Sequence, residues 1–306
     1  MNILITGYTG FVGSQLVKKL SDRNLSGVDI LQNNSVHHHF QWEELGQCKD
    51  QNCIVHLAGK AHDTRDMTSM EEYFDINLGL TQKIFDLFLA SSATKFIFFS
   101  SVKAVADNIN GEILTEDAIC NPKTPYGLSK LAAEQYIFSK PLSNDKKIYI
   151  LRPCMIHGPG NKGNLNLLFK LQQKGLPWPL GAFENKRSFC SIDNILYVVQ
   201  QLIDGNIESG IYQVADDVAL STNDLIRLMA LSQKKKAKIW RISPKLIKVI
   251  ARVGDFFHLP LNSERLSKLS ESYIVSNKKI KHVLGLEKMP VSAVIGLQKT
   301  FEFFKK

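Results

Sequence analysis

The chain has 306 residues, 44% of them hydrophobic and 22% charged, and carries a formal net charge of +9 at pH 7. That length allows one elaborated domain or two, and the composition is that of a globular protein rather than a fibrous or disordered one. No apolar run reaches the roughly 18 residues that a membrane-spanning helix needs, and the first residues lack the pattern of a signal peptide.

The positive charge leaves three classes of partner open: nucleic acid, an anionic membrane surface and an anionic small molecule. Apart from a cluster at residues 234–238, lysines and arginines are spread along the chain without an RNP, zinc-finger or helix-turn-helix signature. We therefore expect an anionic ligand and no nucleic acid. The five cysteines are scattered without a C-x-x-C pair, which predicts reduced thiols and a cytoplasmic location.

The first predicted element is a short apolar strand over residues 2–6. It is followed by three glycines at a spacing of three, Gly7, Gly10 and Gly13, and then by apolar residues at helical spacing. Glycines between a strand and a helix let the backbone approach a pyrophosphate, and the helix N-terminus offers free N–H groups and a partial positive charge. The pattern predicts a dinucleotide-binding site.

A second short strand ends at Asp29. An acid at this place can accept both ribose hydroxyls of NAD and would repel the 2′-phosphate of NADP, so NAD is the expected cofactor and NADP the less favoured one. Residues 37–39 are three consecutive histidines. Neighbouring side chains on a strand point to opposite faces, so we expect no metal site there.

Apolar strands are predicted at residues 53–59, 96–99 and 147–151, and an amphipathic helix over residues 71–92 contains Asn77. Fully apolar strands are typical of a parallel sheet that is covered on both faces. Because strands and helices alternate along this half, we predict an α/β fold with a Rossmann-type doubly wound parallel sheet.

Tyr126 and Lys130 lie four residues apart in a predicted helix, so they share one face, and Ser101 follows a predicted strand. A phenol with a pKa near ~10 is a poor base at neutral pH. An ammonium group one turn away favours the phenolate, so we predict that Lys130 lowers the pKa of Tyr126. The pair suits proton transfer to or from a substrate oxygen.

After about residue 155 the pattern changes to loops and irregular elements. We predict a first domain over residues 1–155 and a smaller C-terminal lobe over residues 156–306. A helix of about residues 193–203, with Asp193 as its cap, is expected to pack back on the first domain. Residues 244–257 form a basic amphipathic helix.

Several motifs occur in one order along nearly the whole chain: Thr6-Gly7-Tyr8-Thr9-Gly10-Phe11-Val12-Gly13, His56-Leu57-Ala58-Gly59, Asn77, Ser100-Ser101, Tyr126 with Lys130, and Arg152-Pro153. Together they resemble the extended short-chain dehydrogenase/reductase family, in its nucleotide-sugar epimerase/dehydratase group and UDP-glucose 4-epimerase-like subgroup. Residues 176–181 and 185–188 look like the nucleotide-sugar-binding half of that family.

The resemblance implies a role for each matching residue. The expected catalytic residues are Ser101, Tyr126 and Lys130. The residues expected to contact the cofactor are Gly7, Gly10, Phe11, Val12, Gly13, Asp29, Leu57, Ala58, Gly59, Asn77, Tyr126, Lys130 and Pro153. The residues expected to contact a UDP-sugar or another nucleoside-diphosphate sugar are Ser101, Asn164, Leu165, Trp178, Leu180, Arg187 and Arg265, with Leu180 on the uracil and Arg187 on the diphosphate.

The chain also departs from the family pattern. Family dehydratases carry Asp-Glu directly after the catalytic hydroxyl, whereas Val102 and Lys103 follow Ser101 here, so we expect no 4,6-dehydration. We interpret Lys103 as a solvated side chain. Established 4-epimerases have Asn in place of Met155 and Lys in place of Ala61.

The expected function is an NAD(P)-dependent epimerase acting at C4 of a UDP-hexose or UDP-N-acetylhexosamine through a 4-keto intermediate. A 4-keto-6-deoxy nucleotide-sugar reductase with the same site is the alternative, and a non-catalytic NAD-binding sensor or scaffold is a minor one. The resemblance also implies a part in polysaccharide biosynthesis. Apolar residues on more than one side of the helices at about 71–92 and 126–140 predict a homodimer through these helices.

Overall fold

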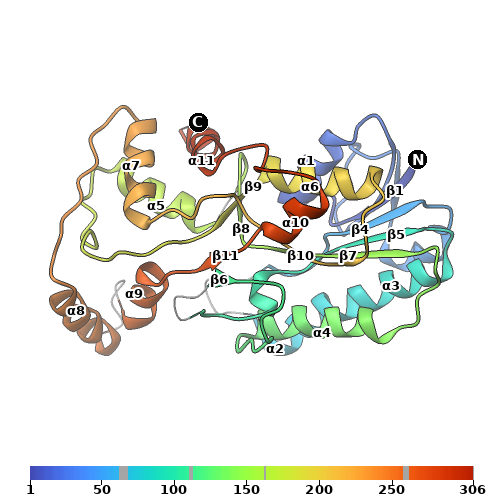
Figure 1. Ribbon diagram of the computed structural model, residues 1–306, viewed down its shortest axis with the longest axis horizontal. Helices are drawn as coiled ribbons and strands as arrows, with labels where there is room; N and C mark the ends of the chain where they lie inside the picture. Colours follow the sequence, from blue (N-terminus) through green and yellow to red (C-terminus); the bar gives the residue numbers. More distant parts are fainter. Residues whose placement is uncertain (62–67, 110–112, 162, 258–261, 306) are drawn as a thin grey trace.

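The computed structural model describes residues 1–61, 68–109, 113–161, 163–257 and 262–305. Seven parallel strands form one sheet in the order β10-β7-β5-β4-β1-β2-β3, with helices on both faces (Figure 1). The strands are β1 (Asn2–Thr6), β2 (Asn24–Val28), β3 (His38–Phe40), β4 (Cys53–His56), β5 (Lys95–Phe99), β7 (Lys147–Pro153) and β10 (Gly210–Val214). The predicted doubly wound parallel sheet is confirmed.

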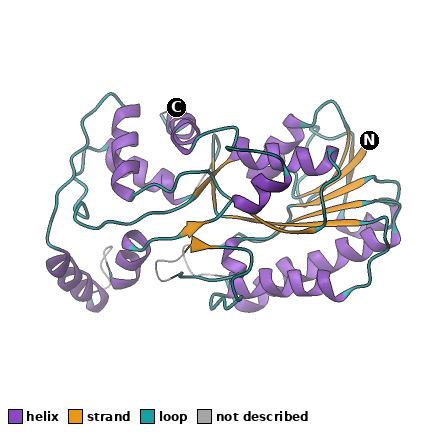
Figure 2. Ribbon diagram, in the orientation of Figure 1, coloured by secondary structure: helices purple, strands orange, loops and turns teal. Residues whose placement is uncertain are grey.

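Alternate residues of the central strands enter two different apolar layers. Ile3 and Ile5 of β1 pack with α1 (Phe11–Lys19) and α6 (Ile192–Asp204), and Leu4 packs on the opposite side with α3 (Leu80–Ala90) and α4 (Pro125–Ser139). Successive side chains of a strand point to opposite faces, so a strand covered on both sides reads as a continuous apolar run. Figure 2 shows the two purple helical layers on either side of the orange strands.

The helix predicted at residues 71–92 is divided into α2 (Met70–Phe74), the π-helical turn η2 (Asp75–Gly79) and α3. Such a turn adds a residue to the helical repeat and occurs often at functional sites. Asn77 lies within it and is fully buried. Its side chain donates to Ser129 Oγ at 3.0 Å and accepts from the Lys60 N–H at 2.8 Å, which ties the turn to α4 and to the segment after β4.

Two elements from beyond residue 155 belong to the first half of the fold. Strand β10 pairs with β7 in the sheet, and helix α6 packs on α1. The N-cap of α6 is Ser191, whose Oγ accepts from the Asp193 N–H at 3.3 Å. The prediction of Asp193 as the cap is therefore wrong: the helix begins two residues earlier. The domain boundary near residue 155 stays a prediction.

The remaining helices are α5 (Asn164–Gln173), α7 (Thr222–Ser232), α8 (Pro244–Phe256), α9 (Ser263–Ser270), α10 (Lys278–Val283) and α11 (Ala293–Phe303), with the short 3-10 helices η1 (Trp42–Gln47) and η3 (Val102–Ala104). Two further pairs of parallel strands join β6 (Ile113–Leu114) to β11 (Ile274–Val275) and β8 (Met155–His157) to β9 (Phe189–Ser191). Helices α5, α7 and α11 share one apolar cluster, and α8 and α9 share another.

About half of the apolar residues on which the homodimer prediction rests are buried by the chain itself, and the others are partly buried. Ile84, Phe85, Phe88 and Ile137 are fully buried between α3, α4 and the sheet, whereas Phe138 is 55% exposed. The expected apolar patch on α3 and α4 is therefore smaller than the sequence suggested. Among the described residues, no helix is both long and apolar enough to span a bilayer.

Candidate active site

A cavity of about 520 Å³ opens where β1, β4, β5 and β7 end, and residues from beyond residue 155, called the lobe residues below, close its other side. In an open parallel sheet, the carboxyl ends of the strands are where ligands bind. The cavity brings together many of the residues predicted from sequence: Gly7, Gly10, Phe11, Val12, Gly13, Leu57, Gly59, Ser101, Tyr126, Lys130, Pro153, Leu165 and Arg187.

Two glycines of the turn between β1 and α1, Gly7 and Gly13, have no room for a Cβ. Gly7 has φ +68°, and a Cβ there would lie 2.7 Å from the Ala58 nitrogen. A Cβ on Gly13 would lie 2.2 Å from the Gly7 oxygen. Gly10 caps α1 without a side-chain bond, so the helix turns bare backbone N–H groups toward the cavity. This cradle fits the pyrophosphate of a dinucleotide.

Three predicted cofactor residues, Asp29, Ala58 and Asn77, are not among the described residues that line the cavity. The carboxylate of Asp29 accepts from the Thr9 N–H at 3.0 Å and from the Thr9 hydroxyl at 2.8 Å, which fixes it beside the glycine turn. The Ala58 N–H donates to Thr6 Oγ1 at 3.1 Å. Asn77 holds the segment after β4 in place through Lys60, as described above.

Tyr126 lies in the first turn of α4 with its hydroxyl near Ser101, which is 8% exposed at the end of β5. The Tyr73 ring packs edge-on against Tyr126, with 6.0 Å between centroids. Burial raises the pKa of Tyr126, against the opposing effect of the hydrogen bond with Ser101. The prediction that Lys130 lowers this pKa is therefore wrong for the protein as described, because the cost of burying a phenolate is the larger effect.

The side chain of Lys130 is buried one turn below Tyr126 and points to the end of β5. Its Nζ donates to the Phe99 carbonyl at 2.9 Å and lies 5.0 Å from the centre of the Phe98 ring. Burial lowers the pKa of Lys130 to about 8, and the nearby Glu134 opposes this. A Cβ on Gly59 would come within 3.2 Å of Nζ, so the ammonium group borders the cofactor side of the cavity.

A buried ion pair that the sequence analysis missed supports this wall. Glu134 accepts from Arg152 Nε at 2.9 Å and from Arg152 Nη2 at 2.5 Å, and the Ser100 hydroxyl also donates to it. Glu134 follows Tyr126 and Lys130 on the same helical stripe, one further turn along α4. The spacing of four was thus a signal that could have revealed it.

The lobe contributes Arg187, whose backbone is held from two sides. Its N–H and carbonyl exchange hydrogen bonds with Leu220, both at 2.9 Å, and it also bridges to Tyr273. Burial lowers the pKa of Arg187, while nearby Glu271 acts in the opposite direction. An anion in the cavity would relieve the cost of burying this cation.

Leu180, Trp178 and Arg265 are not among the described residues that line the cavity. Leu180 is 3% exposed and packs on α8 and α9, and Trp178 pairs through its backbone N–H with the Lys238 carbonyl at 2.8 Å. Arg265 is exposed on α9. Asn164 begins α5, and its side chain lies outside the described part of the structure.

Lys103 and Tyr273 are cavity residues that the sequence analysis did not identify as such. Lys103 Nζ donates to the Asp107 carbonyl at 2.7 Å and lies 4.4 Å from the centre of the Tyr273 ring, so its interpretation as a solvated side chain is wrong. The Tyr273 hydroxyl donates to the Ala106 carbonyl at 2.7 Å. No sequence signal links Tyr273 to Lys103, because only the tertiary fold joins these distant segments.

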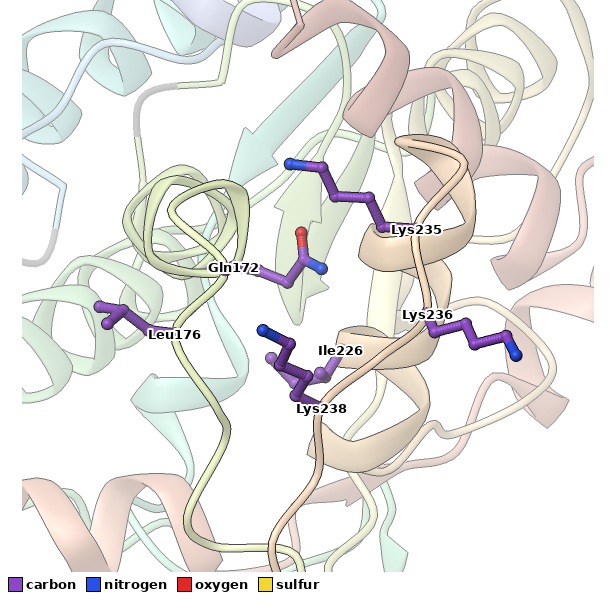
Figure 3. A pocket seen from close by; sticks show the side chains of 7 residues that line it. Gln172, Leu176, Ile226, Lys235, Lys236 and Lys238 are labelled. Carbon is purple, nitrogen blue, oxygen red and sulfur yellow. The ribbon is translucent and has the colours of Figure 1, made fainter.

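A second hollow of about 400 Å³ lies between α5 and α7 and is bordered by Lys235, Lys236 and Lys238. Figure 3 shows the Lys236 side chain pointing away from the hollow, while Lys235 reaches across it. Lys235 Nζ donates to the Gln173 carbonyl at 3.2 Å. Because the three ammonium groups diverge, the hollow is not arranged around one small anion.

The fold and the cavity define a Rossmann-type dinucleotide-binding protein with a serine, a tyrosine and a lysine beside the glycine cradle. Residues 3–215 match the sequence model of the NAD dependent epimerase/dehydratase family. Because the match covers more than half of the chain, the chain belongs to that family.

Similar proteins include a UDP-glucose 4-epimerase of Vibrio cholerae, 29% identical over 329 aligned positions that cover 99% of this chain and 95% of the relative. An N-acetyl-alpha-D-glucosaminyl-diphospho-ditrans,octacis-undecaprenol 4-epimerase of Escherichia coli O157:H7 is 27% identical, covering 77% of this chain and 73% of the relative. The crystal structure of UDP-glucuronic acid 4-epimerase from Bacillus cereus in complex with NAD superposes with a TM-score of 0.77 at 20% identity, covering 100% and 99% of the two chains. That last likeness concerns the fold.

Proposed function

We propose that this chain is an NAD-dependent epimerase that inverts C4 of a UDP-hexose or UDP-N-acetylhexosamine. One observation carries the proposal: Ser101, Tyr126 and Lys130 line the same cavity as the glycine cradle. The activities named for the relatives from Vibrio cholerae and Bacillus cereus support the same chemistry.

Bound NAD would supply a reversible hydride acceptor for C4 of the sugar. Ser101 holds the 4-oxygen, and Tyr126 accepts the O4 proton as the C4–H bond breaks, which leaves a 4-ketose. When the hydride returns to the opposite face of the ketose, Tyr126 gives the proton back to O4. The atoms therefore balance over one cycle without a further reactant.

Lys130 would hold the cofactor ribose and keep positive charge near the phenol. Its depressed pKa, about 8, means that neutral pH still favours the ammonium form. The raised pKa of Tyr126 favours the phenol in the protein without ligands. To accept the O4 proton, Tyr126 would have to be the phenolate, which the positive charges of Lys130 and of bound NAD would favour. Arg187 would face the diphosphate of the substrate, and residues 156–306 would supply the substrate side of the cavity as a separate lobe.

The alternative is reduction of a 4-keto-6-deoxy nucleotide sugar at the same site, with Tyr126 donating the proton. The two activities differ in their need for external cofactor. An epimerase regenerates its NAD in each cycle, whereas a reductase consumes NADH or NADPH in proportion to product.

The decisive experiment measures the dinucleotide released from the purified, denatured protein and then incubates native protein with UDP-glucose or UDP-N-acetylglucosamine. We expect bound NAD and formation of the C4 epimer with no added cofactor. Tyr126→Phe serves as the inactive control. Absence of any epimer, together with NADH oxidation that depends on a 4-keto-6-deoxy sugar, would reject the epimerase in favour of the reductase.

A homodimer through residues of about 71–92 and 126–140 remains part of the proposal, supported by the exposed Phe138 on α4. Light scattering should then report about twice the chain mass of 34.5 kDa. A mass of one chain at micromolar concentration would remove the dimer without affecting the catalytic assignment. The cytoplasmic location and the part in polysaccharide biosynthesis stay predictions.

A further inference from the structure

Helix α8 presents an apolar stripe to the outside of the lobe. Leu246, Val249, Ile250, Val253, Phe256 and the following Phe257 are each at least 42% exposed. Their spacing of three and four residues puts them on one face. The inner face of the same helix consists of Ile247, Ala251 and Gly254, the first two packed against Leu180 and Leu266. The outer stripe is therefore additional to the face that holds α8 on the protein.

A basic stripe runs beside this apolar one. Lys245, Lys248 and Arg252 are exposed at the same helical spacing. Residues 233–252 contain eight lysines and arginines and neither aspartate nor glutamate. Asp255 is the one acid of α8, and its carboxylate is bound to the N–H and hydroxyl of Ser263. Figure 1 shows this stretch at the edge of the lobe farthest from the sheet.

An exposed apolar stripe flanked by basic residues is the pattern of a helix that lies in the surface of a bilayer. The apolar side chains enter the region below the headgroups, and the lysines and arginine pair with anionic lipid phosphates. We propose that α8 docks this protein on an anionic membrane surface. The interaction does not rest on the proposed catalytic function, and α8 is too short to span the bilayer.

A second copy of the chain is a poorer occupant of this surface. In a twofold interface the same patch meets itself, so the basic stripe of one copy would approach that of the other. Like charges brought together across an interface oppose association. A bilayer containing anionic lipid offers both an apolar interior and the opposite charge.

The test is co-sedimentation of the whole protein with vesicles of phosphatidylcholine alone or with about a third phosphatidylglycerol. We expect the anionic vesicles to bind at least about tenfold more protein, and raising the salt to about 0.5 M to reverse most of that gain. Replacing Lys245, Lys248 and Arg252 by glutamine should lower binding roughly a hundredfold, since each basic residue near an anionic surface contributes on the order of 1 kcal/mol.

The variant Val249→Ser/Val253→Ser/Phe256→Ser should lose binding to both kinds of vesicle, and Ile119→Ser is its control because Ile119 is 91% exposed on the other half of the chain. Near-ultraviolet circular dichroism checks that each variant keeps its tertiary packing. Phe256→Trp adds a direct readout, since brominated acyl chains should quench its fluorescence beyond the quenching of the wild type.

Two results would overturn the proposal. One is equal binding of the wild type and the triple serine variant to anionic vesicles, with no added quenching in Phe256→Trp. The other is a dimeric wild type that becomes monomeric in the serine variant, which would assign the apolar stripe to a second copy of the chain.

Discussion

The two walls of the cavity are built in different ways. The sheet wall consists of strand ends, the glycine cradle and α4, and its polar groups bond to one another: Glu134 holds Arg152 and Ser100. The lobe wall places Arg187 through backbone pairing with Leu220 and Tyr273, which come from distant parts of the chain. A buried hydrogen-bond network thus fixes the sheet wall, whereas the position of Arg187 in the lobe wall depends on backbone pairing between separate loops.

Because the two walls are built differently, we expect the sheet wall to bind the cofactor and the lobe wall to select the substrate. A preorganised wall suits a cofactor that is the same in every cycle and in every member of a family. A wall assembled from loops can vary its residues without disturbing the sheet, which suits the choice of substrate. Four substitutions test this division, from the largest expected effect to the smallest.

Arg152→Met should destabilise the protein by about 3–5 kcal/mol, because it leaves Glu134 buried without its cationic partner. The two side chains are 3% and 2% exposed. Urea unfolding monitored by circular dichroism measures the effect. The double variant Glu134→Leu/Arg152→Met should recover at least about 1 kcal/mol of that loss. A single variant that unfolds like the wild type would show that the network does not stabilise the sheet wall.

Arg187→Ala should weaken binding of a UDP-sugar by roughly 2–4 kcal/mol and leave NAD affinity almost unchanged, because only the lobe wall loses a charge-assisted partner of the diphosphate. Calorimetry with UDP and separately with NAD measures both. Equal weakening of the two ligands would mean that the walls do not divide the ligands between them. Lys186→Ala, at the exposed neighbouring position, is the matched control.

Tyr126→Phe should lower turnover by at least about a hundredfold, the usual scale for a lost acid–base group, and keep both ligands bound. The substitution removes the hydrogen bond between this hydroxyl and Ser101, so the free energy of unfolding should fall by only about 1 kcal/mol. Tyr73→Phe is the control, since that ring packs against Tyr126 at 6.0 Å. Near-normal turnover in Tyr126→Phe would remove the phenol from the mechanism.

His56 should make the sheet wall sensitive to acid. It is buried between Thr6 and Thr81, and burial, assisted by Lys130, lowers its pKa from 6.5 to about 3. The folded-state pKa lies below the unfolded one, so this contribution to stability is present above pH 6.5 and is lost as the pH falls toward 3.

From pH 7 to pH 5 the wild type should therefore lose about 2 kcal/mol more unfolding free energy than His56→Gln. Urea unfolding at the two pH values measures this difference, in which the titration of all other groups cancels. The same loss in both proteins would show that His56 is not held neutral.

The sheet side could be predicted from the sequence because its signals are local. The cradle is predicted by the spacing of Gly7, Gly10 and Gly13 alone. That Tyr126 and Lys130 share a face follows from the helical repeat. The position of Glu134 on that face also follows from the helical repeat, because it lies four residues after Lys130. Two local predictions still failed. The cap of α6 is Ser191 rather than Asp193. The pKa of Tyr126 is raised, because its burial depends on atoms that the neighbouring sequence does not contain.

The sequence by itself determined the doubly wound sheet and its glycine turn, since hydrophobic periodicity and glycine spacing reflect backbone geometry within a few residues. Only the tertiary structure decided the lobe side. It buries Leu180 under α8, brings Tyr273 onto Lys103 and turns the second face of α8 outward. These contacts join segments far apart in the chain, and their geometry is set by the packing of the whole molecule rather than by any local pattern.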